Sequence, residues 1–242
     1  MNSSSKFIQR TVPVGRLQCN CQILVCPLTL EAVLVDPGDE PKKILSEIEA
    51  IEKQLRETKP DAKIKVKALF HTHAHFDHIG ATKAVKEFFQ ARANEDGGQS
   101  TVPQIFLHKA DETMYLKLKM QASMFGFEGT DPLPIDQYFE NEQKLKVGSM
   151  KFTIIHTPGH SPGGVCMRMH EDSATAIPET VFTGDTLFKG DIGRADLWGG
   201  DEPTLIRSIR NRLLVLDGDT IAWPGHGASS TIGLEKSSNP YI

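Results

Sequence analysis

Four side chains that commonly bind metal ions lie within six residues, in the segment His73-Ala-His75-Phe-Asp77-His78. Imidazole nitrogens and carboxylate oxygens at this density suit zinc, with iron or manganese as alternatives. Packing gives no reason to gather three imidazoles and a carboxylate where a strand meets a helix. We therefore predict that this segment binds metal. His71, just before it, is interpreted as a structural histidine.

Three later segments each place one further ligand type directly after a glycine. They are Thr157-Pro-Gly-His160, Thr183-Gly-Asp185 and Pro224-Gly-His226-Gly227. A single turn of this kind is ordinary, because Pro-Gly and Gly-Asp are common turn sequences. Catalytic loops on a rigid scaffold also have this form. Together with the first cluster, the three segments predict a catalytic metal centre.

Apolar segments precede these loops and must position them. Alternation and apolar runs predict strands at 21–26, 31–36, 63–70, 104–107, 151–156, 164–169, 180–183 and 220–223. Helical spacing of apolar residues predicts helices at 41–55, 79–91 and 203–214, and residues 94–100 are expected to form a polar excursion. Strands interrupted by helices favour a layered α/β (α+β) fold. We expect one domain spanning residues 1–242.

Composition narrows the range of functions. The 242 residues carry a formal net charge of −4, which gives no broad electrostatic reason to bind nucleic acid or anionic membranes. The chain contains no apolar run of about 20 residues and begins without an apolar stretch of signal-peptide length, so we expect a cytoplasmic protein. Four cysteines lack partners at metal-binding spacing and are predicted to be buried structural thiols: Cys19, Cys21, Cys26 and Cys166.

The four ligand segments, in this order from about residue 10 onward, resemble the metallo-β-lactamase superfamily. The resemblance implies a four-layer αββα sandwich with two divalent metal ions at one edge, between the sheets. It implies that one ion, most simply zinc, is held by His73, His75 and His160. The second ion would be held by Asp77, His78 and His226, and Asp185 would bridge the two.

Within that superfamily the chain is most similar to the glyoxalase II (hydroxyacylglutathione hydrolase) branch, in its short, single-domain bacterial form. The segments 184–201, 224–233, 239–241 and 124–127 carry this resemblance. It implies a thioesterase that cleaves S-D-lactoylglutathione, or a related small thioester, by attack of a metal-bridging hydroxide. Asp77 and Asp185 are the expected catalytic residues. Aspartate at position 185, where β-lactamases with two zinc ions often carry cysteine, argues against β-lactamase activity.

Arg194 stands where glyoxalase II enzymes carry a lysine, and Asp196 stands where they carry a tyrosine. Arg194 either binds a substrate carboxylate or is a structural residue of its loop. The segment 120–139 either forms an apolar wall over the site or packs into the core.

Three other functions are compatible with the same ligands. The first is a persulfide dioxygenase, which would use one iron ion at positions matching His73, His160 and Asp185. The second is a phosphodiesterase or nuclease, which the acidic balance of charge disfavours. The third is a non-catalytic metal-binding module. The sequence does not indicate an oligomeric state.

Overall fold

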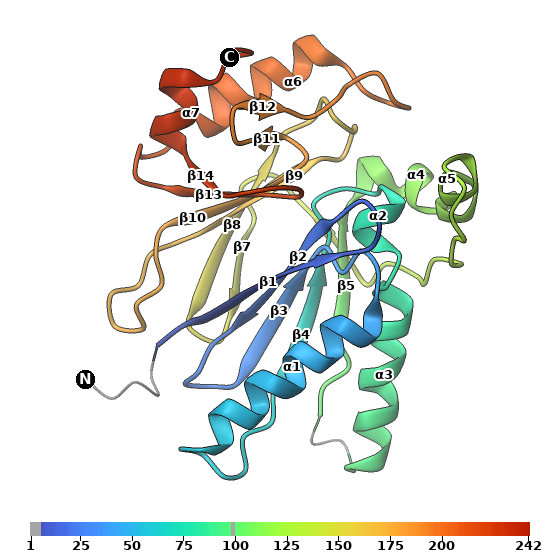
Figure 1. The fold of residues 1–242 in the computed structure, drawn as a ribbon, viewed down its shortest axis with the longest axis vertical. Helices are drawn as coiled ribbons and strands as arrows, with labels where there is room; N and C mark the ends of the chain where they lie inside the picture. Colours follow the sequence, from blue (N-terminus) through green and yellow to red (C-terminus); the bar gives the residue numbers. More distant parts are fainter. Residues whose placement is uncertain (1–5, 98–99) are drawn as a thin grey trace.

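Two six-stranded sheets pack face to face, and helices cover their outer faces (Figure 1). This computed structural model describes residues 6–97 and 100–242. The arrangement confirms the αββα sandwich that the sequence predicted. Part of the predicted excursion at 94–100 lies outside the described residues, since it includes residues 98 and 99.

The first sheet comes from the N-terminal part of the chain. Its strands, in spatial order, are β1 (Ile8–Val14), β2 (Cys19–Val25), β3 (Glu31–Val35), β4 (Lys65–Phe70), β5 (Gln104–His108) and β6 (Gln137–Phe139). The pairs β1–β2 and β2–β3 are antiparallel, whereas β3 to β6 are parallel. The helices in this part are α1 (Pro41–Arg56), α2 (Phe76–Ile79), α3 (Thr82–Glu95), α4 (Glu112–Tyr115) and α5 (Leu118–Met124), with a 3₁₀ turn at Lys109–Asp111.

The second sheet comes from the C-terminal part. Its spatial order is β14 (Ser230–Thr231), β13 (Ile221–Pro224), β10 (Thr180–Gly184), β9 (Val165–Met169), β8 (Met150–His156) and β7 (Lys144–Val147). β10 and β13 are parallel and adjacent, so the loops that follow them lie at the same edge. The remaining elements are a small sheet of β11 (Leu187–Phe188) and β12 (Asp191–Ile192), the helices α6 (Glu202–Ser208) and α7 (Ile232–Ser238), and a π-helical turn at Ile209–Leu213.

Three apolar clusters separate the four layers. Ile48 of α1 packs in a cluster with alternate side chains of β2, β3 and β4 on the outer face of the first sheet. Phe70 and Phe152 belong to the cluster between the two sheets, with ring centroids 5.7 Å apart. Leu205 of α6 packs against the outer face of the second sheet. Because the middle cluster takes side chains from both sheets, it supports the proposal of a single domain.

The structure corrects one predicted helix and adds elements that were not predicted, among them a strand. The helix predicted at 79–91 is divided into α2 and α3, because the backbone amide of Ala81 donates to the carbonyls of Pro37 and Gly38, both at 3.1 Å, and so leaves the helical pattern. The strand β1 was not predicted, because it is a half-buried edge strand that contains Pro13, and proline weakens a strand pattern.

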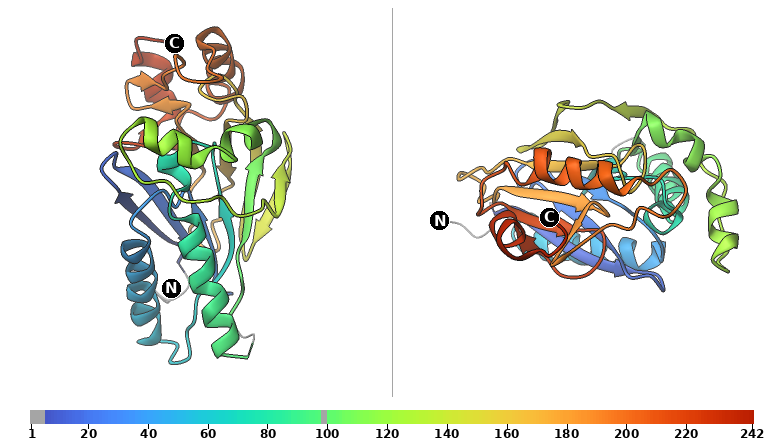
Figure 2. Two further views of the ribbon diagram at one scale, coloured as in Figure 1. Left: turned by 90° about the vertical axis from the view of Figure 1, so that its right-hand side faces the viewer. Right: turned by 90° about the horizontal axis from the view of Figure 1, so that it is seen from above.

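The short helices α4 and α5 lie outside the four layers. In Figures 1 and 2, α5 lies beside α2, and the two helices are in contact. This position brings α5 next to the loop that follows β4. No helix within residues 6–97 and 100–242 has both the length and the apolar character needed to cross a membrane.

Candidate metal centre

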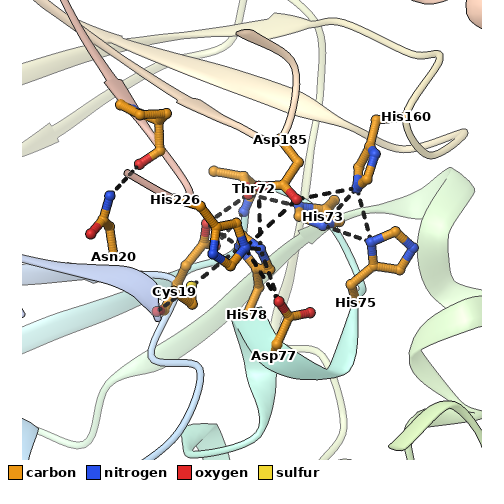
Figure 3. Close-up of polar contacts among 12 residues, drawn as sticks. Cys19, Asn20, Thr72, His73, His75, Asp77, His78, His160, Asp185 and His226 are labelled. Atoms are coloured by element: carbon orange, nitrogen blue, oxygen red, sulfur yellow. Dashed lines mark hydrogen bonds and ion pairs between the residues drawn. The ribbon is translucent and has the colours of Figure 1, made fainter. Parts of the chain in front are cut away.

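All seven side chains that the sequence singled out as ligands come together at one edge of the sandwich (Figure 3). Four come from the loop after β4 and from α2. The other three come from the loops after β8, β10 and β13 of the second sheet. The groups that meet are His73, His75, Asp77, His78, His160, Asp185 and His226.

Three imidazole nitrogens face one another in the first cluster. His73 Nε2 lies 3.0 Å from His75 Nδ1 and 3.2 Å from His160 Nε2. His160 Nε2 lies 2.9 Å from His75 Nδ1. Three nitrogens can share one small cation in this arrangement.

Asp77, His78 and His226 form a second cluster on the other side of Asp185. The Nε2 atoms of His78 and His226 are 3.2 Å apart, and His226 Nε2 lies 3.3 Å from Asp77 Oδ2. Asp185 lies between the clusters. Its Oδ1 is 3.4 Å from His78 Nε2, and its Oδ2 is 3.6 Å from His160 Nε2.

Backbone carbonyls set the tautomers of two of these histidines. His160 Nδ1 donates to the carbonyl oxygen of Arg194 at 2.7 Å, and His226 Nδ1 donates to that of Leu17 at 2.9 Å. A carbonyl can only accept, so in each neutral ring the proton is on Nδ1. Nε2 therefore presents a lone pair to the cluster, as metal-bound histidines do.

Asp36 sets the tautomers of two more. Its carboxylate accepts hydrogen bonds from the Thr72 hydroxyl at 2.7 Å and from His78 Nδ1 at 3.0 Å. Because the hydroxyl hydrogen is committed to Asp36, Thr72 Oγ1 must accept from His73 Nδ1, which is 3.0 Å away. His73 and His78 therefore also direct Nε2 lone pairs inward.

Burial favours the neutral form of two of these imidazoles, His73 and His75. It lowers the pKa of His73 well below its ordinary value, and the neighbouring histidines lower it further. Burial and the nearby His160 lower the pKa of His75 to about 3. Cys19 lies 3.5 Å from His78 Nδ1, but burial raises the pKa of its thiol to about 12. Cys19 is thus a neutral neighbour, and all four cysteines are buried and unpaired, as predicted.

The residues present fit a pair of cations. Several nitrogen lone pairs converge within hydrogen-bonding distance without donors between them, and lone pairs so placed repel unless a positive charge lies between them. In addition, Asp185 Oδ1 is buried and has no hydrogen-bond partner in the described part of the chain. Buried carboxylate oxygens normally accept a hydrogen bond, so a buried oxygen without a hydrogen-bond partner fits the role of a cation ligand.

Asp111, which was not singled out from the sequence, joins two of the loops that carry the clustered side chains. Its buried carboxylate accepts from the backbone amides of Ala74 and Gly163 and from the Ser161 hydroxyl, at 3.0, 2.5 and 2.8 Å. It therefore ties the loop after β4 to the loop that carries His160. Asp111 lies in a polar segment with no motif around it, so its contacts with the two loops could not be predicted from the sequence.

The other candidate histidines remain outside the centre. His71 is buried and contacts Thr82 Oγ1 at 3.2 Å, and burial lowers its pKa to about 4. His108 and His156 stack on each other with ring centroids 4.1 Å apart. The position of His71 agrees with the structural role predicted for it.

A cavity of about 260 Å³ opens over the centre. His75, Asp77, His160 and Asp185 lie along it, and its other lining side chains are mostly apolar: Leu17, Phe76, Met114, Met120, Met124, Phe125, Leu197 and Trp198. The start of the segment 120–139 thus forms an apolar wall rather than part of the core.

Arg194 also lines this cavity, and its guanidinium forms an ion pair with Asp196. Nε and an NH₂ group donate to the two carboxylate oxygens of Asp196, at 2.7 and 2.9 Å. Both side chains are more than half exposed. The pair with Asp196 therefore takes up two of the five N–H donors of the guanidinium, on the edge that would bind a carboxylate in bidentate fashion.

The comparisons with known proteins agree with this geometry. Residues 14–226 match the model of the Metallo-beta-lactamase superfamily. The chain is 36% identical over 232 residues, 96% of each chain, to the hydroxyacylglutathione hydrolase GloC of Haemophilus influenzae. It also resembles the solved structure of BLEG-1 B3 metallo-beta-lactamase, with 34% identity and a TM-score of 0.76, covering 97% of this chain and 99% of that one. A second solved structure, TTHA1623 in a di-iron-bound form, is 33% identical with a TM-score of 0.72, covering 96% of this chain and 100% of that one. The chain belongs to the metallo-beta-lactamase superfamily and is a metallo-hydrolase of that superfamily.

Proposed function

We propose that this protein is a binuclear metal-dependent thioesterase of the glyoxalase II type. The observation that carries the proposal is the pair of ligand clusters on either side of Asp185. His73, His75 and His160 would hold one ion, and Asp77, His78 and His226 the other. Asp185 would bridge them, because its carboxylate lies within 3.6 Å of His160 Nε2 in the first cluster and within 3.4 Å of His78 Nε2 in the second.

When bound, the two ions supply an activated water and polarise the carbonyl of the substrate. The chain's own residues then have two tasks. Asp77, which lines the cavity, would accept a hydrogen bond from the attacking water and so fix its direction. The inward lone pairs of the histidines would hold the ions, and with them the reacting groups, in one place. A thiolate is a good leaving group, so no side chain is needed as a strong acid.

The 36% identity to hydroxyacylglutathione hydrolase GloC supports S-D-lactoylglutathione, or a related thioester, as the substrate. Arg194 is proposed to bind a carboxylate of the thiol carrier once it has left Asp196. Zinc is the proposed metal, although the resemblance to a di-iron protein makes iron the first alternative. A complete second cluster favours a two-metal hydrolase over a dioxygenase with a single iron.

The test combines metal analysis with turnover of S-D-lactoylglutathione. We expect about two ions per chain and hydrolysis of the thioester. Asp185→Asn, which keeps the shape but removes the charge, should bind fewer ions and lose at least about 100-fold in turnover. Asp191→Asn is a matched control, because Asp191 is an exposed aspartate in the β11–β12 hairpin, outside both clusters.

Other outcomes redirect the assignment. One iron per chain with oxygen uptake in the presence of a persulfide would replace the thioesterase by a dioxygenase. Hydrolysis of nitrocefin without hydrolysis of thioesters would favour a β-lactam substrate, in line with the similarity to BLEG-1. An Asp185→Asn protein that kept two ions and normal turnover would falsify the bridging role.

A further inference from the structure

We infer that the preferred substrates carry an apolar acyl group, larger than lactoyl, that lies against a wall of methionine and aromatic side chains. This inference rests on the proposed thioesterase function and names its substrate class. The wall is defined as Met120, Met124, Phe125, Leu197 and Trp198.

The wall consists of large apolar side chains that water reaches. Met124 is 75% exposed, Phe125 is 50% exposed and Trp198 is 47% exposed. Contiguous exposed apolar surface is uncommon in soluble proteins and usually marks a binding site. The wall adjoins the ligand clusters, since the same cavity is lined by His75, His160 and Asp185.

The polar side chains beside the wall offer little to an acyl group. The side-chain amide of Gln121 donates to the carbonyls of Ala74 and Met114, at 3.0 and 2.7 Å. The guanidinium of Arg194 is paired with Asp196 and is assigned to the thiol carrier in the proposed function. A polar arm placed on the wall would leave water without gaining hydrogen bonds, which is costly. The peptide part of glutathione, with its amides and charged ends, therefore fits the wall poorly.

The size of the cavity also favours one arm of the thioester. Pockets that hold a whole small-molecule ligand measure about 300–1,000 Å³. The cavity here, about 260 Å³, is smaller. An acyl chain or ring beside the metal centre would fill it, while the thiol carrier extends outside. Methionine side chains adapt to different shapes, so the wall suits a range of alkyl and aryl acyl groups.

A second cavity near the centre is less suited to an apolar group. It shares Leu17, Phe76 and Asp77 with the first cavity. Its lining includes the charged side chains Arg16, Asp39 and Glu128. The acyl arm is therefore assigned to the wall and not to this second cavity.

The first experiment uses the metal-loaded full chain and a series of glutathione thioesters: S-acetyl, S-butanoyl, S-hexanoyl and S-D-lactoyl. We expect kcat/KM to rise about twofold per added methylene, roughly half of the logarithmic gain that complete burial of a methylene gives. S-Butanoylglutathione should exceed S-D-lactoylglutathione, whose hydroxyl has no partner on the wall. A flat or falling series with measurable turnover overturns the inference and leaves the thioesterase proposal intact.

Variants of the wall test its location. Met124→Gln and Trp198→Gln should each lower kcat/KM for S-hexanoylglutathione about 3- to 10-fold and change that for S-acetylglutathione less than twofold. Because both side chains are exposed, these variants are expected to fold. Leu116→Gln is the matched control: Leu116 is 65% exposed on the neighbouring segment but does not line the cavity. Equal losses with both thioesters contradict a role in acyl binding.

A binding measurement separates the two proposals. S-Hexylglutathione and S-methylglutathione are thioethers that a thioesterase does not cleave, and Trp198 in the wall reports their binding through its fluorescence. We expect S-hexylglutathione to bind at least about 10-fold more tightly. If no thioester is cleaved but this difference is found, the thioesterase proposal fails and the apolar site stands. Equal binding of the two thioethers overturns the apolar site.

Discussion

Asp36 contacts two of the proposed ligand histidines, one of them through Thr72, although it faces neither an ion position nor the cavity. The residue has a positive φ of 51°, a conformation that aspartate and asparagine adopt more readily than most residues. This conformation turns its carboxylate toward Thr72 and His78. One buried charge therefore orients a ligand in each cluster.

The variant Asp36→Asn tests this role. Asparagine keeps the shape and tolerates the positive φ, but it removes the charge that holds the His78 Nδ1 proton. We expect the second ion to bind about 10- to 100-fold more weakly, as is typical when a group that supports a metal-bound histidine is lost. Zinc titration against a competing chelator measures the change. Asp39→Asn, an exposed change in the same loop, should bind both ions normally, and unchanged affinity in Asp36→Asn contradicts the assignment.

The side chains that come together in the two clusters could be singled out from the sequence, because each lies in a short segment whose composition is itself unusual. Asp36 and Asp111 could not be predicted in the same way. Their partners lie 36 to 52 residues away, on other elements. Aspartate after a strand is also an ordinary turn residue. Only the folded arrangement shows that these two carboxylates support the centre.

At the scale of elements, the loops after β10 and β13 approach so closely that only glycine fits between them. A Cβ on Gly225 would lie 2.3 Å from Asp185 Oδ1 and 2.6 Å from His78 Cε1. The backbone amide of Gly225 also donates to the carbonyl of Gly184 at 2.8 Å. The two loops thus form one unit that carries Asp185 and His226.

Gly225→Ala should disrupt this unit. The added methyl group displaces Asp185, so we expect loss of at least one ion per chain and a fall in turnover of at least about 100-fold, with secondary structure retained. Metal analysis and circular dichroism measure these effects. Gly218→Ala is the matched control, because its Cβ would meet its nearest neighbour at an ordinary 3.5 Å. Full metal content in Gly225→Ala would show that the loops can move apart.

The strands before the ligand loops were predicted because they are apolar, and those of the second sheet also end at or close to glycine or proline. The helices α4 and α5 were not predicted, because each is only one or two turns long and shows no clear apolar period. The apolar wall depends on α5, so the sequence left two interpretations of the segment 120–139 open. The exposure of Met124 and Phe125 decides between them.

At the scale of the whole molecule, the proposed ligands join the two sheets. Four come from the first sheet's side and three from the second. Ions that bind only the folded chain stabilise it, by about 4 kcal/mol when the free ion is about 1,000 times its dissociation constant. Such ions would act across the interface of the sandwich.

Removing the metal should therefore lower thermal stability. For a chain of this length, 1 kcal/mol corresponds to roughly 2–4 °C in the melting temperature. We expect dialysis against a chelator to lower Tm by about 10 °C, and added zinc to restore it. Calorimetry of the two forms is the measurement, with Asp185→Asn as a control that should show a smaller difference. Identical melting curves for the two forms would mean that the ions do not join the sheets.

The contact between the β1–β2 turn and the last ligand loop spans 209 residues. His226 Nδ1 donates to the Leu17 carbonyl, and the amide of Asn20 donates to the carbonyl of Gly225 at 2.7 Å. A ribosome makes the chain from the N-terminus at about 5–20 residues per second. His73, His75 and His160 are therefore synthesised several seconds before His226. If these residues hold the two proposed ions, the first position would be complete during synthesis while the second still lacked His226, and the order of translation would favour filling the first position before the second.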